Sequence, residues 1–206
     1  MAHQENKKTM VVIGSTGVGK STFCNLVAGR GHDDDKVFKV SPSGDSCTNT
    51  TSSDEVKWRG VGFPLTLIDT PGLSDSSEDN FNNILDMVTV LEKHEKIDVF
   101  VLTINGSQLK LEQKFTDMLL IFRLCFGQQF LEKNTIVEVT NWAYDDVAIK
   151  RRIEDEETVK QKINKSIEKE LQKIISNCND GIISNCNDGI KNQVEVFFID
   201  ALHYTG

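Results

Sequence analysis

The fold of this chain is decided by the stretch GSTGVGKS at residues 14–21, which fits the pattern G-x-x-x-x-G-K-[ST] of a phosphate-binding loop. A short apolar run at Thr9–Ile13 precedes it and predicts a buried strand. Residues Thr22–Ala28 follow it with apolar side chains at helical spacing. A strand, a glycine loop and a helix N-terminus in series present backbone N–H groups and a positive helix dipole to a phosphate. This stretch, called the phosphate loop below, therefore predicts a nucleotide-binding site.

Each residue type in the phosphate loop has a chemical reason. Gly14 and Gly19 permit backbone angles and close approaches that a Cβ atom would block. Lys20 supplies a positive charge to the β- and γ-phosphates, and the Ser21 hydroxyl can bind Mg²⁺. The residues of this region that we expect to bind nucleotide are Ser15, Thr16, Gly17, Val18, Gly19, Lys20, Ser21 and Thr22.

Length and composition exclude several other classes of protein. The 206 residues suit a single α/β domain. A formal net charge of -8 argues against nucleic acid as a partner, because an acidic surface repels phosphate backbones. Five cysteines without metal-ligand spacing or a signal peptide indicate reduced thiols and a cytoplasmic location. The apolar stretches are too short for a transmembrane segment, so peripheral membrane association would need partners or segments beyond Gly206.

A polar segment after the first helix is placed where a nucleotide-sensing switch would lie. Residues Gly31–Thr51 predict a long loop, in which Thr48 is a candidate second hydroxyl ligand for Mg²⁺. Thr50 and Thr51 are rivals for that role. The alternative interpretation is a solvated loop rich in Ser and Thr.

A second switch is predicted where the strand Pro64–Ile68 runs into Asp69-Thr70-Pro71-Gly72. Such a strand end places the Asp69 carboxylate near Mg²⁺ and the Gly72 N–H near the γ-phosphate. The alternative is an ordinary Pro-Gly turn. The next residue, Leu73, stands where Ras-type enzymes carry a glutamine that orients the attacking water, so we expect slow hydrolysis.

The remaining apolar patterns alternate between strand and helix. They predict a three-layer α/β domain, 1–206, with a mostly parallel six-stranded sheet and helices on both faces. Residues 1–8 are expected to be flexible, and 174–191 form an expanded loop in which an eight-residue segment is repeated. The further elements expected are strands at 54–58, 97–104, 135–140 and 194–199, and helices at 80–94, 111–126 and within 147–175.

Together these motifs resemble a G domain of the AIG-type family, also called immunity-associated nucleotide-binding or GIMAP proteins, which is similar to septins and to Toc receptors. The motifs that carry the resemblance are the phosphate loop, Ser46-Cys47-Thr48, Asp69-Thr70-Pro71-Gly72-Leu73 and the stretch 111–127. The resemblance implies GTP or GDP with Mg²⁺ as cofactors. By position it makes Ser21, Thr48 and Asp69 the metal ligands, and Lys20, Thr48 and Gly72 the catalytic groups.

The guanine-reading sequence Asn-Lys-x-Asp of common G domains is absent. Thr140-Asn141-Trp142 stands in its place, so Asn141 could hydrogen-bond the base and Trp142 could stack on it. Either Asp145 or Asp146 would then read the ring N–H groups, and the backbone N–H of Ala201 would meet the guanine O6 atom. The alternative is that Trp142 simply packs under the loop.

The resemblance also predicts a homodimer or oligomer through the nucleotide face. Some members of the family supply an arginine across this face, whereas Gln108 occupies that place here and Lys110 is close by. The overall expectation is a guanine nucleotide-binding GTP/GDP switch with slow, Mg²⁺-dependent GTPase activity. The alternatives are a GTP-binding assembly scaffold with negligible hydrolysis and a generic phosphate-loop ATPase.

Overall fold

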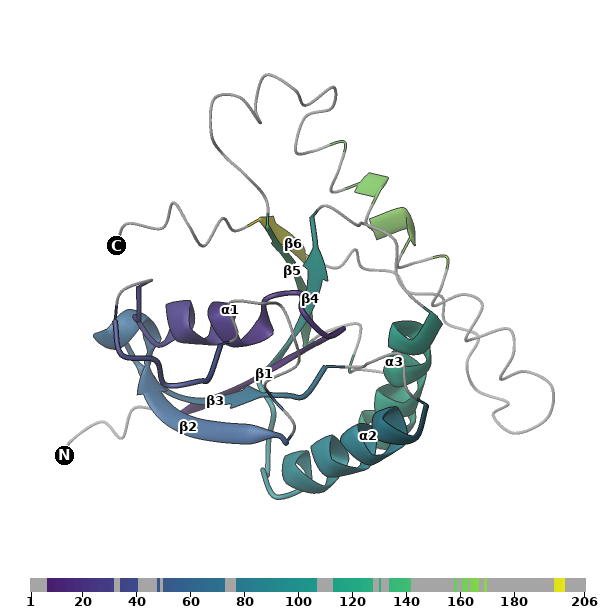
Figure 1. Cartoon of the computed structure of the whole chain (residues 1–206), viewed down its shortest axis with the longest axis horizontal. Helices are drawn as coiled ribbons and strands as arrows, with labels where there is room; N and C mark the ends of the chain where they lie inside the picture. Colours follow the sequence, from purple (N-terminus) through teal and green to yellow (C-terminus); the bar gives the residue numbers. More distant parts are fainter. Residues whose placement is uncertain are drawn as a thin grey trace.

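A computed structural model shows one six-stranded sheet with the strand order β2-β3-β1-β4-β5-β6 (Figure 1). Five strands run parallel, and β2 pairs antiparallel with β3 at one edge. The strands are β1 (Lys8–Gly14), β2 (Ser52–Lys57), β3 (Pro64–Asp69), β4 (Val99–Asn105), β5 (Thr135–Thr140) and β6 (Glu195–Phe198). The structure describes residues 7–31, 34–40, 48, 50–72, 77–106, 113–127, 130, 134–141, 158, 161–162, 164–166, 169 and 195–198.

Helices cover both faces of the sheet and complete the three-layer α/β architecture expected from the sequence (Figure 1). Helix α1 (Lys20–Val27) packs on one face, and α2 (Ser77–Leu91) and α3 (Gln113–Phe126) pack on the other. Alternate side chains of β1 supply both cores. Val11 and Ile13 join the α2–α3 core, whereas Met10 and Val12 join the α1 core.

Aromatic side chains fix α3 against the sheet. The ring of Phe100 on β4 lies 4.5 Å from that of Phe130 and 5.5 Å from that of Phe126, in edge-to-face and tilted arrangements. Phe122 is fully buried in the same group. Helix α3 ends at Gly127, whose φ of 81° is a left-handed angle that suits glycine at a helix C-terminus.

Some element boundaries differ from the sequence expectation. Helix α2 begins at Ser77, three residues before the expected start, and ends at Leu91 rather than His94, because residues 92–95 form turns. Trp58, expected to end a strand, instead opens a short 3₁₀ turn. Lys8, expected to be flexible, is the first residue of β1 and pairs with Leu65. The described residues between 158 and 169 are helical, and the repeat within 174–191 lies outside the described residues.

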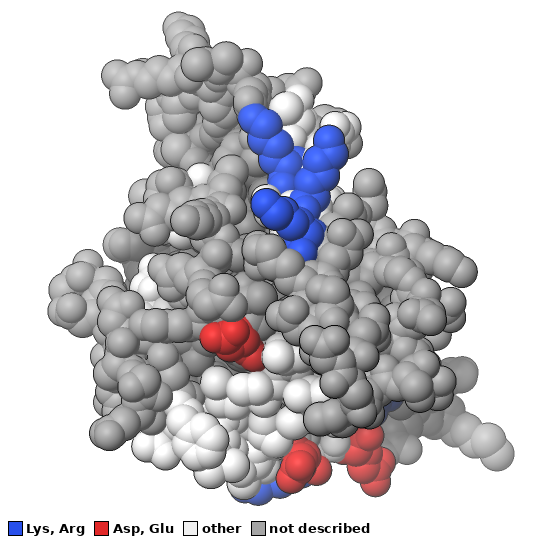
Figure 2. All heavy atoms as spheres, turned by 90° about the vertical axis from the view of Figure 1, so that its right-hand side faces the viewer, with Lys and Arg blue, Asp and Glu red and all other residues white. Residues whose placement is uncertain are grey.

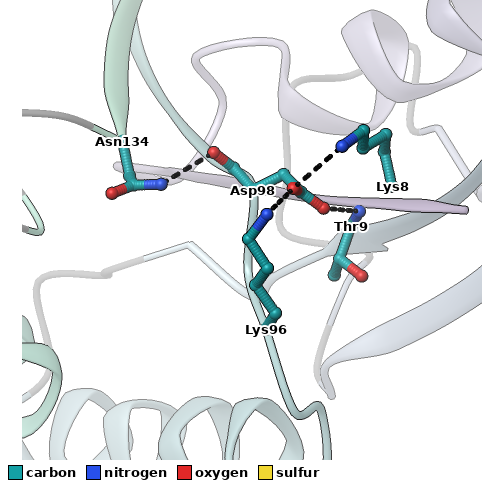
Figure 3. A network of polar contacts seen from close by, with 5 residues as sticks. All are labelled: Lys8, Thr9, Lys96, Asp98 and Asn134. Carbon is teal, nitrogen blue, oxygen red and sulfur yellow. Dashed lines mark hydrogen bonds and ion pairs between the residues drawn. The ribbon is translucent and has the colours of Figure 1, made fainter. Parts of the chain in front are cut away.

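A polar network closes the edge of the sheet at which β1 and β4 begin (Figure 3). The Asp98 carboxylate accepts a hydrogen bond from the backbone N–H of Thr9 at 3.0 Å. It also forms an ion pair with Lys96 at 2.6 Å. The Asn134 amide donates to the backbone carbonyl of Asp98 at 2.9 Å. Because these contacts join the starts of β1, β4 and β5, the opposite ends of the strands are held in register as well.

A buried carboxyl group lies beside the phosphate loop. Glu138 of β5 is 2% exposed and lies next to Thr103 in the strand register, on the sheet face that α1 covers. Within the described part of the chain, Glu138 Oε1 and Thr103 Oγ1 have no hydrogen-bond partner. Burial raises the pKa of Glu138 to about 8, because the charged carboxylate loses its hydration.

We predict that Glu138 makes folding stability fall as the pH rises. The folded state keeps the Glu138 proton up to about pH 8, whereas the unfolded state loses it near the ordinary glutamate pKa of 4.5. The stabilisation is therefore complete below pH 4.5 and is lost as the pH rises through this window, by an amount on the order of 5 kcal/mol. Urea unfolding between pH 5 and 8.5 should show a flatter profile for Glu138→Gln than for wild type. The exposed Glu95→Gln is the control, and identical profiles for all three proteins would contradict the prediction.

Candidate nucleotide-binding site

The phosphate loop is shaped by close contacts that exclude side chains. A Cβ atom at Gly14 would lie 2.5 Å from the carbonyl oxygen of Thr103 on the neighbouring strand β4. Gly17 and Gly19 have φ angles of 75° and 96°, in the left-handed region that other residues rarely adopt. Gly19 is also the N-cap of α1, so the loop opens directly onto the helix N-terminus.

Lys20 begins α1 and bends back over the loop. Its Nζ atom donates a hydrogen bond to the Ser15 carbonyl at 2.9 Å, and the residue is 6% exposed. Burial lowers the pKa of Lys20 to about 8, and the nearby Asp69 charge opposes that shift. A cation held in this way is a ready partner for a phosphate, because an anion compensates its lost hydration.

Three oxygen-bearing side chains from distant parts of the sequence meet at the first turn of α1. Ser21 Oγ lies 3.1 Å from Thr48 Oγ1 and donates to Asp69 Oδ2 at 2.6 Å. Of the three threonines considered from the sequence, Thr48 is thus the one that meets Ser21. Thr50 is exposed, and the backbone N–H of Thr51 instead donates to Asp86 of α2 at 2.7 Å.

Asp69 is the most buried charged group of the site, at 1% exposure. Burial raises the pKa of Asp69, and hydrogen bonding from Ser21 and the charge of Lys20 counteract the shift. The Cys24 thiol, one turn further along α1, also hydrogen-bonds to this carboxylate. The second oxygen, Oδ1, is buried and has no partner among the described residues, so it remains available to a cation.

The segment after β3 packs tightly on the phosphate loop. The Thr70 hydroxyl donates to the Val12 carbonyl at 2.7 Å, which ties the turn to β1. A Cβ atom at Gly72 would lie 2.4 to 2.7 Å from backbone atoms of Thr16. The Asn83 amide of α2 donates to the Gly72 carbonyl at 3.2 Å. Gly72 therefore lies directly against the loop and is also connected to α2.

A buried asparagine anchors part of the segment Gly31–Thr51, in which the sequence predicts a switch. The Asn25 amide nitrogen donates to the carbonyls of Ser21 and Phe38 at 2.9 and 2.8 Å. Its oxygen accepts hydrogen bonds from the backbone N–H groups of Val37 and Phe38 at 2.9 and 3.0 Å. The side chain thus uses both ends to join α1 to residues 37–38.

The end of β5 lies behind the phosphate loop. The Thr140 hydroxyl donates to the Val18 and Ile104 carbonyls, the second at 3.1 Å. Asn141 follows with a φ of 54°, a left-handed angle that asparagine tolerates better than most residues. The strand end therefore delivers Asn141 to the edge of the sheet that carries the phosphate loop. The base-reading candidates Trp142 and Ala201 lie outside the described residues.

The structure brings the phosphate loop, Lys20, Ser21, Thr48, Asp69 and Gly72 together at one edge of the sheet. Sequence reasoning missed Asn25, Cys24 and Asp86 as parts of this arrangement, and it named Thr140 only as part of the base-reading segment. Asn25 had a visible signal, because a polar residue one turn after Ser21 interrupts the apolar face of a short helix. The other three carried no comparable signal.

The fold and the glycine-shaped loop define a phosphate-loop domain with the architecture of G domains. The sequence matches the AIG1 family over residues 8–195, and the chain belongs to that family. No curated protein matches the chain. Among the described helices, none is both long enough and apolar enough to cross a bilayer.

Solved structures with the same fold include two of Toc33 from Arabidopsis thaliana. One, in complex with GDP and Mg²⁺, has a TM-score of 0.65 at 21% identity, over 95% of this chain and 71% of Toc33. The other is a dimerization-deficient mutant with the same TM-score and coverage at 20% identity. Era from Aquifex aeolicus, bound to GDP and AlF4⁻, has a TM-score of 0.53 at 17% identity, and the match covers 95% of this chain and 52% of Era.

We predict that Asn25→Ala destabilises the protein by about 3 kcal/mol, because it leaves buried backbone groups of residues 37–38 unpaired. Urea unfolding at a single pH measures this loss. Thr89→Ala is the control, since its exposed hydroxyl makes one bond within α2, and it should change stability by less than about 0.5 kcal/mol. Equal stabilities for the two variants would show that the Asn25 contacts are not significant.

Proposed function

We propose that this protein binds GTP and GDP and switches between the two states, with slow Mg²⁺-dependent hydrolysis of GTP. The observation that carries the proposal is the convergence of Ser21, Thr48 and Asp69 beside Lys20. One group comes from each of the phosphate loop, the first switch segment and the end of β3. A nucleotide can therefore couple all three parts of the chain.

The residues of the site fit Mg²⁺. This cation prefers oxygen ligands, and two hydroxyl groups and one carboxylate meet here. The buried, unpartnered Oδ1 of Asp69 provides a further ligand or an acceptor for a metal-bound water. Ser21, Thr48 and Asp69 would hold the ion, which when bound neutralises charge on the β- and γ-phosphates.

Lys20 and Gly72 are placed to respond to the γ-phosphate. The Lys20 ammonium would exchange the Ser15 carbonyl for phosphate oxygens, which restores compensation to a buried cation. The tight contact of Gly72 with Thr16 lets a backbone N–H approach the same phosphate. Because Gly72 is bonded to Asn83, a change at the phosphate would reach α2.

Slow hydrolysis is supported by the sequence after Gly72. Leu73 has no hydrogen-bonding atom in its side chain to orient a water molecule, and Gln108 stands where some members of the family supply an arginine. Both residues lie outside the described part of the chain. The same two residues favour the alternative function, a GTP-dependent assembly scaffold without appreciable turnover. Phosphate release measured over several turnovers distinguishes the switch from the scaffold.

Guanine recognition is proposed for the segment that follows β5. Thr140 is bonded to the phosphate loop through the Val18 carbonyl, so Asn141 follows directly after a residue that contacts the loop. Asn141 would hydrogen-bond the base, Trp142 would stack on it, and the Ala201 N–H would meet the guanine O6 atom. Toc33, which shares the fold, was solved with GDP and Mg²⁺.

We predict that guanine nucleotides alone compete for the site. Nucleotide-free protein would be titrated with fluorescent GDP in the presence of Mg²⁺, and the signal competed with GDP, GTP, ADP and ATP. GDP and GTP should displace the probe, and ADP and ATP should not. Equal displacement by all four would favour the generic phosphate-loop ATPase.

Lys20→Ala is the negative control in this titration. It should abolish binding while thermal unfolding remains cooperative, because Lys20 belongs to neither of the two hydrophobic cores. Retained affinity in this variant would contradict the assignment of the phosphate site.

We also predict that the protein associates through its nucleotide face when GTP is bound. Light scattering at tens of micromolar should give a higher mass with a non-hydrolysable GTP analogue than with GDP. Thr48→Ala should reduce the difference, because it disconnects the first switch segment from Ser21. An unchanged mass would count against dimerisation, and nucleotide binding by the same sample would show that the switch itself is intact. A cytoplasmic, membrane-peripheral location is part of the same proposal.

A further inference from the structure

The hairpin between β2 and β3 carries the most exposed large apolar side chain in the described part of the chain. Residues 57–63 read KWRGVGF, called the hairpin tip below, and Val61 is 88% exposed while Phe63 is 45% exposed. The tip contains two cationic residues and no acidic one, although the chain as a whole has a net charge of -8. Its composition therefore differs from that of the surrounding surface.

The hairpin tip has a defined shape. The Trp58 N–H donates to the Phe63 carbonyl at 3.0 Å, and the Gly62 N–H donates to the Trp58 carbonyl at 2.7 Å. The two aromatic rings stack with centroids 5.8 Å apart and planes 7° apart. Trp58 also packs against the α1 core, so the base of the tip is anchored in the domain. Val61 is thus presented to solvent on a structured turn.

The turn that follows α1 packs against the hairpin tip. Gly29 has a φ of 75°, and a Cβ atom there would lie 2.5 Å from the Arg59 carbonyl carbon and the Gly60 nitrogen. Arg59 itself adopts a φ of 52°, which costs free energy for a residue other than glycine. This close packing limits bending of the tip. The tip would therefore lose little conformational entropy when it contacts another surface.

Positive charges surround the base of the tip. Arg30 and Lys57 line one groove together with Gly60, and Arg59 is exposed beside Val61. Asp54 and Glu55 of β2 line the same groove, and Glu55 is paired with Lys7. Lys57 and Arg59 belong to the tip, whereas these two carboxylates precede it in the sequence of β2.

We propose that the hairpin tip inserts into a membrane surface that contains anionic lipids. Val61 and Phe63 would enter the boundary of the acyl chains, Trp58 would lie at the level of the headgroups, and the cations would contact lipid phosphates. A protruding turn with a single apolar apex fits a deformable lipid surface, whereas the standard protein interface is far broader. The tip lies at one end of β3 and Asp69 at the other, so the nucleotide edge faces away from the contact.

A second cationic surface offers a competing explanation for any binding to anionic lipid. Lys162, Lys165 and Lys169 are exposed on the helical residues drawn green at the right of Figure 1. The face in Figure 2 shows a group of Lys and Arg side chains in its upper half. This surface would attract anions through charge alone, so it provides the control position for the experiment.

The apolar contact is tested by co-sedimentation of the full chain with vesicles of phosphatidylcholine alone or with 30 mol% phosphatidylserine. We expect binding only to the anionic vesicles. Val61→Asp should weaken it by at least about tenfold, because it removes apolar burial and adds repulsion. Leu124→Asp, at a 60% exposed position on α3, should bind as wild type does. Absence of wild-type binding, or equal loss in both variants, would overturn the proposal.

The charge contribution is tested with a matched pair of variants. Lys57→Glu should reduce binding to the anionic vesicles about tenfold, and Lys165→Glu, which changes the net charge equally, should not. Loss of binding in Lys165→Glu alone would overturn the proposal and assign the contact to the surface of Figure 2. Unchanged thermal unfolding of every variant ensures that the losses report on the contact.

Discussion

The buried carboxylate of Asp69 is the constraint on which the site depends. A charge at 1% exposure is tolerated only where hydrogen bonds and opposite charge compensate its lost hydration. Ser21 supplies the hydrogen bond and Lys20 the charge, both from the first turn of α1. The parallel pairing of Val12 with Asp69 fixes the register of β3 against β1, the strand that leads into the phosphate loop and α1. A shift of one residue in this register would turn the carboxylate to the opposite face of the sheet and leave Lys20 without its partner.

The same register positions the phosphate loop from its other side. On β4, the Thr103 carbonyl oxygen lies 2.5 Å from where a Cβ atom of Gly14 would be, and the Thr140 hydroxyl of β5 donates to the Val18 carbonyl. The loop is therefore held by the ends of neighbouring strands as well as by the hydrogen bond from Lys20 to the Ser15 carbonyl. The buried Glu138 and Thr103 oxygens directly behind it show a cost of this arrangement, because polar groups are left without partners there. On the α1 side of the sheet, the residues behind the phosphate loop therefore include buried polar groups that do not favour folding stability.

The parts of this structure that local patterns encode could be predicted from the sequence. The phosphate loop and the strand that ends at Asp69 are such parts, because glycine positions and apolar runs act over a few residues. Asn25 could not be assigned its role, since its partners lie 12 to 13 residues away in a polar loop with no regular pattern. Thr140 was treated as part of a base-reading segment, whereas its hydroxyl bonds across 122 residues to Val18. The start of α2 was placed too late because residues 77–79 carry no apolar side chain to begin the helical pattern.

Strand β3 joins the two surfaces to which functions are assigned. It begins at the hairpin tip and ends at Asp69, and six residues of strand span roughly 17 to 20 Å. Because β3 pairs with β1 on one side and β2 on the other, the strand cannot bend enough to bring its ends together. A membrane bound at the tip would therefore leave the nucleotide edge facing the aqueous side. There a second copy could reach it without meeting the lipid, so membrane contact and nucleotide-dependent association are sterically compatible in one domain.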